Sequence, residues 1–318
     1  MSKYADVDRL EESEIEGVAA GLCDLDRQSR EMTGLTIAEL AGESVGFASH
    51  DEALAAQAAV GDGAAPRVAV IPVTSGYGLI GGFAQTLVAI LNHLGANARA
   101  TDKTDLAGLE EAYRARAQLI FMADDYTFTA VSTRGGAMSD NGIATGRAFG
   151  CALAHMARGG EVLVLGAGPV GLSATRYLKG CGFAVSVYDK DPARLSAAVE
   201  ATGAGREQDG CVARYRNILD ATNGADFITA ADVTSETRIS APGIPLGPTA
   251  QVRSLVPVFH NPLELGTAAM YYDCLHQLTS TTAGKRGAVV ANADAAKARF
   301  GRAALARQVA ATFSCEGR

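Results

Sequence analysis

The sequence contains no tryptophan, only 6% of its residues are aromatic, and no apolar run approaches the roughly 20 residues that a transmembrane helix needs. Positive charge is also in the minority, since 28 Lys and Arg stand against 35 Asp and Glu for a formal net charge of -7. Nucleic acids and anionic lipid surfaces attract basic proteins. We therefore expect no nucleic acid and no membrane as partner, and instead a small or cationic molecule.

The six cysteines are scattered, without a CxxC pair or a histidine cluster beside them. This pattern predicts reduced thiols and no metal site. The first residues are rich in glutamate and read neither as a signal peptide nor as an Arg-rich transit sequence, so a cytoplasmic protein is expected. With 318 residues, of which 48% are hydrophobic and 20% charged, the chain is long enough for two globular domains.

The first half of the chain alternates between predicted strands and helices. Apolar residues at helical spacing predict helices over residues 1–60, with a break at Thr33 and Gly34. Strands are then expected at 67–73, 96–100 and 118–122, and helices at 80–94 and 105–116. This alternation favours a parallel sheet. We place an N-terminal helical and α/β substrate domain over residues 1–158.

A long helix over 141–158 leads into a second alternating set. Strands are expected at 161–165, 184–188, 226–229, 238–241 and 256–260, with helices at 169–180, 191–202 and from 265 onward. We expect an α/β protein whose second domain, residues 159–318, is a Rossmann domain with a doubly wound parallel sheet and C-terminal helices.

A glycine motif carries the cofactor prediction. Gly166, Gly168 and Gly171 form GxGxxG between a predicted strand and helix, where a pyrophosphate can meet the helix N-terminus, and Pro169 and Val170 belong to the same loop. The next strand ends in Asp189, a carboxylate suited to ribose hydroxyls, which favours NAD over NADP although Lys190 weakens the exclusion. A glycine turn that binds nothing, or binds S-adenosylmethionine, is the alternative.

A later loop and a lone histidine are open to two interpretations. Pro242, in the segment SAPGIP, follows a strand where a loop flanks the nicotinamide, but a plain Pro-Gly turn explains it equally well. His260 ends another strand; a structural role is favoured there over a catalytic one.

Polar residues also follow the strands of the first domain. Thr74 and Ser75 come after the strand at 67–73, where a ligand carboxylate or a simple helix cap would account for them. Asp124 and Asp125 follow the strand at 118–122, and two adjacent acids favour a bound ammonium, although either could cap a turn. Asn141 begins the long helix, where a polar cap is the alternative.

Taken together, these segments resemble the pyrrolysine synthase PylD family. The resemblance runs from about Leu22 to about Leu275 and is carried by REMTG, IPVTSGYGLIGGF, MADDYTF, VLVLGAGPVG, SAPGIP and NPLELGTAAM. The TSGxG and MADD segments discriminate more than the glycine motif does. An NAD-dependent dehydrogenase of L-lysine-Nε-(3-methyl-D-ornithine) is implied, which oxidises the ornithine side-chain amine and closes a pyrroline ring with loss of ammonia.

The resemblance also implies roles for single residues. Asp124 matches the carboxylate that contacts the reacting amine, and Ser75 matches the serine of TSG, so both are implied to be catalytic; Asn141 matches a substrate-side amide. Thr74 and Asp125 are assigned to the substrate with them, and Thr267 to the cofactor beside the glycine loop, Asp189 and Pro242. No metal is expected, and a homodimer is left open.

This chain departs from the family pattern at two places. Asn261 stands where the family usually has Glu, and Glu264 stands three positions later where Gly is usual, so we hypothesise that Glu264 replaces the lost charge at the substrate. Pro169 replaces a Lys of the glycine motif. The alternatives are an NAD(P)-dependent dehydrogenase of another amino acid, an opine or a folate adduct, and a redox sensor that binds NAD without catalysis.

Overall fold

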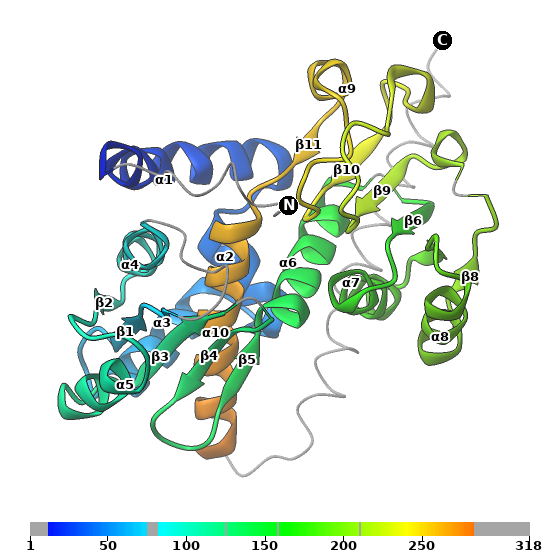
Figure 1. The fold of residues 1–318 in the computed structure, drawn as a ribbon. Helices are drawn as coiled ribbons and strands as arrows, with labels where there is room; N and C mark the ends of the chain where they lie inside the picture. The colour runs from blue at the N-terminus through cyan, green and yellow to red at the C-terminus, as the bar shows by residue number, and fades with distance from the viewer. Residues whose placement is uncertain (1–11, 75–81, 125, 158, 210, 283–318) are drawn as a thin grey trace, which may run out of the picture. The chain divides into compact units, whose positions relative to one another are not determined.

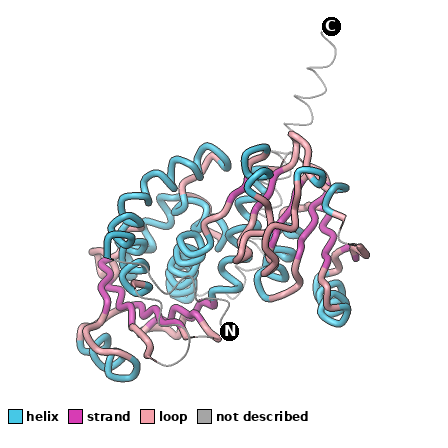
Figure 2. Tube along the Cα trace, turned by 45° about the horizontal axis from the view of Figure 1, so that its top comes forward, coloured by secondary structure: helices cyan, strands magenta, loops and turns pink. Residues whose placement is uncertain are grey.

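A computed structural model describes residues 12–74, 82–124, 126–157, 159–209 and 211–282. Within these ranges the contacts form two compact units, one of residues 12–148 with 263–282 and the other of residues 149–262. Each unit contains its own β-sheet, drawn as arrows in Figure 1 and as magenta segments in Figure 2. No helix within the described ranges has the length and apolar character to cross a bilayer.

The sheet of the first unit has five strands in the order β2-β1-β3-β4-β5. The strands are β1 (Arg67–Ile71), β2 (Asn97–Ala100), β3 (Leu119–Ala123), β4 (Phe128–Ser132) and β5 (Met138–Asp140). β1 pairs in parallel with β2 and β3, as the alternation of strands and helices predicts. β4 and β5 run antiparallel, which the expectation of an all-parallel sheet did not include. Short turns, not helices, join β3 to β4 and β4 to β5. The spacing of apolar residues therefore does not switch between strand and helix periods there, and the sequence does not mark these strands.

Helices cover this sheet and build the rest of the first unit. They are α1 (Glu12–Thr33), α2 (Ile37–Val45), α3 (His50–Val60), α4 (Phe83–His93), α5 (Asp105–Arg114), the first part of α6 (Asn141–Met156) and α10 (Pro262–Thr282). In Figure 1, α4 lies above β1 and β2 and α5 lies below them. The expected break at Thr33 and Gly34 is confirmed, because Thr36 and Glu39 form a capping box that starts α2. Residue 80, the expected start of the helix predicted over residues 80–94, lies outside the described residues.

Helix α10 belongs to the first unit by its contacts, whereas the sequence led us to place it with the second. Tyr272 packs edge-on against Phe47, with ring centroids 6.2 Å apart. Asp273 accepts a hydrogen bond from Ser139 Oγ at 2.7 Å and pairs with Arg147 at 2.9 Å. Because α10 is distant in sequence from these partners, its position could not be read from local pattern.

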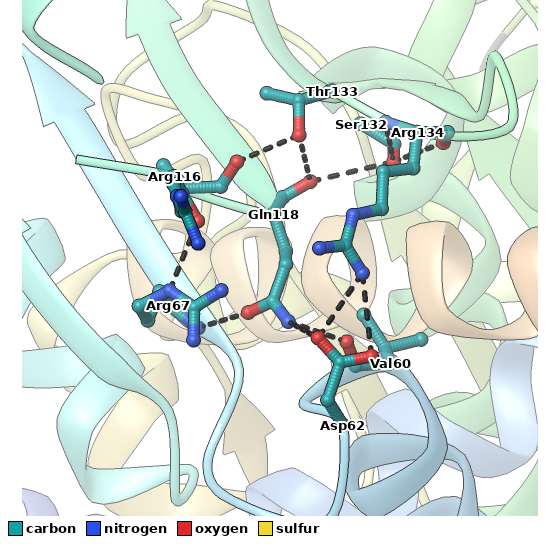
Figure 3. A network of polar contacts seen from close by, with 9 residues as sticks. Val60, Asp62, Arg67, Arg116, Gln118, Ser132, Thr133 and Arg134 are labelled. Atoms are coloured by element: carbon teal, nitrogen blue, oxygen red, sulfur yellow. Dashed lines mark hydrogen bonds and ion pairs between the residues drawn. The ribbon is translucent and has the colours of Figure 1, made fainter. Parts of the chain in front are cut away.

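A polar network lies at the amino-terminal ends of β1 and β3 (Figure 3). Gln118 is only 1% exposed; its Oε1 accepts the backbone N–H of Arg67 at 2.6 Å, and its Nε2 donates to Val60 O at 2.6 Å. Arg134 pairs with Asp62 at 3.1 Å beside it. A buried amide must be hydrogen-bonded to be tolerated, so this network fixes β1 and β3 to the end of α3.

The second unit is a six-stranded, all-parallel sheet in the order β11-β10-β9-β6-β7-β8. Its elements are β6 (Glu161–Leu165), α7 (Pro169–Gly180), β7 (Ala184–Tyr188), α8 (Pro192–Thr202), β8 (Gly205–Arg206), η1 (Val212–Arg214), β9 (Asn217–Asp220), η2 (Ala230–Asp232), β10 (Arg238–Ser240), α9 (Ala250–Leu255) and β11 (Val258–Phe259). This is the strand order 3-2-1-4-5-6 of a Rossmann fold. The predicted α/β class with a doubly wound second domain is confirmed.

One strand prediction in this unit is wrong. The strand expected at 226–229 is a loop with a single bridge at Ile228, and the fourth strand is β9 instead. β9 has only two apolar residues, and they lie between two polar ones. These polar residues are buried as well: Asn217 is 2% exposed and Asp220 is 0% exposed. Both polar ends are tolerated inside because they are hydrogen-bonded, Asn217 Nδ2 to Gly159 O at 2.9 Å and Asp220 to the loop that follows. A hydrophobic pattern therefore does not reveal this strand.

Candidate active site

A cavity of about 300 Å³ opens at the carboxyl ends of β1 and β3 in the first unit. Its walls are largely apolar, formed by residues such as Ile71, Val73, Leu109 and Met122, and two carboxylates, Asp105 and Asp124, line it as well. Ligands of parallel sheets bind at this edge. The cavity lies where the sequence predicts the substrate site.

Asp124 directly follows β3 and is exposed. Its Oδ1 accepts the backbone N–H groups of Tyr126 and Thr127, both at 2.8 Å, and its own N–H donates to Thr127 O at 2.9 Å. The turn-capping interpretation therefore accounts for one carboxylate oxygen. Among the described residues none donates to Oδ2, so this oxygen can accept a hydrogen bond from a ligand in the cavity. Asp125 lies outside the described residues.

Thr74 follows β1, and its hydrogen-bond partner is Asp105, a residue that no sequence motif marks. The backbone N–H of Thr74 donates to Asp105 Oδ1 at 3.0 Å, and its hydroxyl donates to Asp105 Oδ2. These two hydrogen bonds hold the pKa of Asp105 below its ordinary value, so the carboxylate stays ionised. In the sequence, Asp105 reads only as an acid in the first turn of a helix. Ser75 lies outside the described residues.

The remaining substrate-side residues lie at helix starts. Asn141 is the first residue of α6, and its Oδ1 accepts the hydroxyl of Thr145 at 3.1 Å. Asn261 precedes α10, and Glu264 lies in the first turn of that helix; both are partly exposed. Thr267, one turn further, is 0% exposed. The assignments of Asn141, Asn261 and Glu264 to the substrate and of Thr267 to the cofactor stay predictions.

In the second unit, the glycine loop connects β6 to α7 as the motif predicts. Gly166 has φ 91°, and a Cβ there would come within 2.7 Å of Ala221 O. A Cβ on Gly171 would lie 1.8 Å from Gly166 O, whereas a Cβ on Gly168 would meet no atom within 4 Å. Gly168 is also the N-cap of α7 and supplies no side-chain cap. Open space beside an uncapped helix N-terminus fits a pyrophosphate.

Asp189 directly follows β7, beside this loop. Its Oδ2 accepts the backbone N–H of Ala167 at 2.7 Å, and its Oδ1 accepts that of Asp191 at 2.8 Å. Its side chain is 10% exposed, and Arg194 lies 3.9 Å away. The carboxylate therefore orients the glycine loop, a role that the sequence did not indicate. The contact with a ribose, which was expected from the sequence, stays a prediction.

Asp220, at the end of β9, is a second residue that the sequence did not single out. It is 0% exposed and accepts Thr222 N–H at 3.1 Å, Thr222 Oγ–H at 2.7 Å and Gly247 N–H at 3.2 Å. Burial raises its pKa above the ordinary value. Its hydrogen bonds attach the loop that contains Pro242, which is buried, to the edge of the sheet.

His260 has a backbone hydrogen-bond partner, as expected of a structural histidine. Its Nδ1 lies 2.6 Å from Ala241 O, so that ring nitrogen is committed to a backbone carbonyl of the neighbouring strand end. The structural interpretation of His260 agrees with this contact.

Comparisons with known proteins match both units. Residues 16–139 match the family model of the pyrrolysine biosynthesis protein PylD, N-terminal domain, and residues 137–239 match that of the alanine dehydrogenase/PNT C-terminal domain. The pyrrolysine synthase of Methanosarcina acetivorans is 35% identical over 213 residues, which cover 66% of this chain and 82% of that protein. The chain belongs to the pyrrolysine synthase family. The synthase of Methanosarcina barkeri is 33% identical over 213 residues, 66% of this chain and 81% of that protein.

Two solved dehydrogenases also align with this member of the pyrrolysine synthase family. Shikimate 5-dehydrogenase from Thermus thermophilus, in complex with NADP(H) and shikimate, is 18% identical, with a TM-score of 0.47 over 74% of this chain and 99% of that chain. Quinate dehydrogenase from Corynebacterium glutamicum, in complex with NAD, is 15% identical, with a TM-score of 0.46 over 68% of this chain and 94% of that chain.

The family resemblance inferred from the sequence is thus confirmed, and so is the dinucleotide cofactor. The glycine loop, the strand order and the alanine dehydrogenase/PNT match together identify the second unit as the NAD-binding unit of a dehydrogenase.

Proposed function

We propose that this protein catalyses the last step of pyrrolysine formation. In this step L-lysine-Nε-(3-methyl-D-ornithine) is oxidised at the carbon that bears the ornithine side-chain amine, and the electrons pass to NAD as hydride. The ornithine α-amine then attacks the resulting imine, ammonia leaves, and the pyrroline ring closes. The observation that carries the proposal is the 35% identity to a pyrrolysine synthase over 82% of that protein's length.

Asp124 is the residue that we assign to the reacting amine. Its Oδ2 is available at the cavity, whereas Oδ1 is held by the turn, so the carboxylate has one fixed and one free oxygen. An alkyl ammonium has a pKa of about 10.4 and must lose a proton before hydride can leave its carbon. A carboxylate raises that pKa but can also accept the proton, and exclusion of water helps it do so. Asp124 binds the ammonium first and then takes its proton.

The cofactor, when bound, accepts the hydride. Gly166, Gly168 and Gly171, with Pro169 and Val170 between them, would hold its pyrophosphate through backbone N–H groups, and Asp189 would accept hydrogen bonds from the adenosine ribose. Pro242 and Thr267 are also proposed to contact the cofactor, on the basis of the family resemblance.

The finer assignments are proposals of the same kind. Ser75 is proposed as a catalytic residue beside Asp124. Thr74, Asp125, Asn141, Asn261 and Glu264 are proposed to bind the substrate. A substrate domain over residues 1–158 and a cofactor domain over 159–318, with α10 returned to the first by its contacts, and a cytoplasmic location are also proposed. A homodimer is to be tested by analytical ultracentrifugation.

The direct test is to incubate the purified protein with NAD and the lysyl-methylornithine dipeptide. NADH is followed by absorbance and the product by mass spectrometry. We expect NADH and a product lighter by ammonia and two hydrogens in equal amounts. NADH formed from another amino acid but not from the dipeptide would favour a different dehydrogenase, and NAD binding without turnover of any amine would favour a sensor.

A further inference from the structure

One carboxylate occupies both hydrogen-bond donors of Thr74. Asp105 lies 31 positions along the chain, at the start of α5, and accepts the Thr74 N–H through Oδ1 at 3.0 Å and the Thr74 hydroxyl through Oδ2. A hydroxyl has a single proton and two lone pairs. Because its proton is committed to Asp105, the oxygen of Thr74 can only accept hydrogen bonds from other groups.

The fold fixes Asp105 itself. Its backbone N–H donates to Pro72 O at 3.1 Å, and its φ is 53°, a left-handed value that a non-glycine residue keeps only where its surroundings impose it. One turn later, α5 lies so close to β1 that a Cβ on Gly108 would come within 2.7 Å of Ile71 Cγ2. The start of α5 therefore cannot shift without the end of β1, and the Asp105 carboxylate is placed by packing.

We propose that Asp105 is a positioning residue of the active site, which fixes the Thr74 hydroxyl as a hydrogen-bond acceptor for an ammonium group of the substrate. Asp105 and Val73, the neighbour of Thr74, line the same cavity as Asp124. An ammonium offers donors only, so an acceptor-only hydroxyl suits it and a donor would repel it. This inference rests on the proposed function and adds to it a determinant of amine recognition outside the motifs of the sequence.

Asp105→Asn is the informative variant, since an amide has the shape of the carboxylate but can donate to Thr74 Oγ and so reverse the polarity of the hydroxyl. We expect the KM for the dipeptide to rise about tenfold or more, as for a lost hydrogen bond to a charged group, while the KM for NAD is unchanged. Thr74→Val should raise the KM for the dipeptide similarly. Thr74→Ser, which keeps the hydroxyl, should have a KM close to that of the wild type.

The double variant separates positioning from other roles. If Asp105 acts through Thr74, Asp105→Asn adds little to the KM in the Thr74→Val background. Asp102→Asn, an exposed acid of the same loop, is the matched control and should behave as the wild type. A lower melting temperature of Asp105→Asn with an unchanged KM, or fully additive effects in the double variant, would overturn the proposal.

Failure of the proposed function is recognised separately. If the wild type forms no NADH from the dipeptide, that function is refuted, and the same variants are titrated with D-ornithine by calorimetry. Weaker binding to Asp105→Asn than to the wild type then supports the assignment of Asp105. Equal binding, or no binding to either protein, overturns it.

Discussion

Asp189 Oδ2 lies 2.7 Å from the backbone nitrogen of Ala167, so the acid at the end of β7 orients the glycine loop at the end of β6. The two strands are neighbours in the sheet, paired from Glu161 with Ala184 to Leu165 with Tyr188. One carboxylate thus shapes the pyrophosphate loop and stands where an adenosine ribose is expected. If the ribose binds there as proposed, cofactor choice and loop geometry are coupled through a single side chain.

This coupling gives the first prediction. Asp189→Asn keeps one side-chain oxygen, enough for the Ala167 N–H but not also for the Asp191 N–H, and it loses the charge that excludes a 2′-phosphate. We expect the KM for NAD to rise about tenfold and the ratio of kcat/KM for NAD over NADP to fall. Steady-state kinetics with both cofactors measure this. An unchanged ratio would show that Asp189 only orients the loop.

The second prediction concerns Asp124. Asp124→Asn keeps an oxygen to accept the Tyr126 and Thr127 N–H groups, so the turn after β3 and the fold should be preserved. Turnover should fall by at least about a hundredfold, because an amide neither holds an ammonium by charge nor takes its proton. NADH production measures turnover, with NAD binding followed by fluorescence. A variant that turns over at nearly the normal rate would remove Asp124 from the mechanism.

Much of this fold could be predicted where residues adjacent in sequence determine it. The glycine loop, the run at β1 and the capping box at α2 each carry a local pattern of their own. β9 could not be found because its buried ends, Asn217 and Asp220, are polar residues made tolerable by distant hydrogen bonds. Asp105 was missed for the same reason, since its importance depends on a partner 31 positions earlier.

The third prediction tests the departure from the family pattern at the start of α10. If Glu264 supplies the charge that Asn261 lacks, Glu264→Gln should raise the KM for the dipeptide with little change in the KM for NAD. Restoring the family residues with the pair Asn261→Glu and Glu264→Gly should bring the KM back toward that of the wild type. Unchanged turnover and KM in Glu264→Gln would reject the hypothesis.

The fourth prediction concerns pH. Burial lowers the pKa of His276, on α10, below its ordinary value of 6.5, and its ring packs edge-on against Phe47 at 5.1 Å. The unfolded chain therefore binds this proton more readily than the folded protein, so stability is full above pH 6.5 and falls as the pH drops through that value toward the folded pKa. His276→Phe should reduce the difference in melting temperature between about pH 7.5 and about pH 5. The same change at His50, which is exposed, serves as the control and should leave that difference intact.

The last prediction separates two roles of the glycine motif, the packing of α7 against β6 and the approach of the cofactor to the backbone. A Cβ at Gly171 would lie 1.8 Å from Gly166 O, so Gly171→Ala must push α7 away from β6 and should cost about 1 to 3 kcal/mol of stability. A Cβ at Gly168 meets no protein atom within 4 Å, so Gly168→Ala should keep the melting temperature. It should nevertheless weaken NAD binding by about tenfold or more, because the methyl group enters the space proposed for the pyrophosphate. Calorimetric titration and thermal unfolding of both variants measure the two effects, and an undiminished NAD affinity in Gly168→Ala would mean that the cofactor does not approach this backbone.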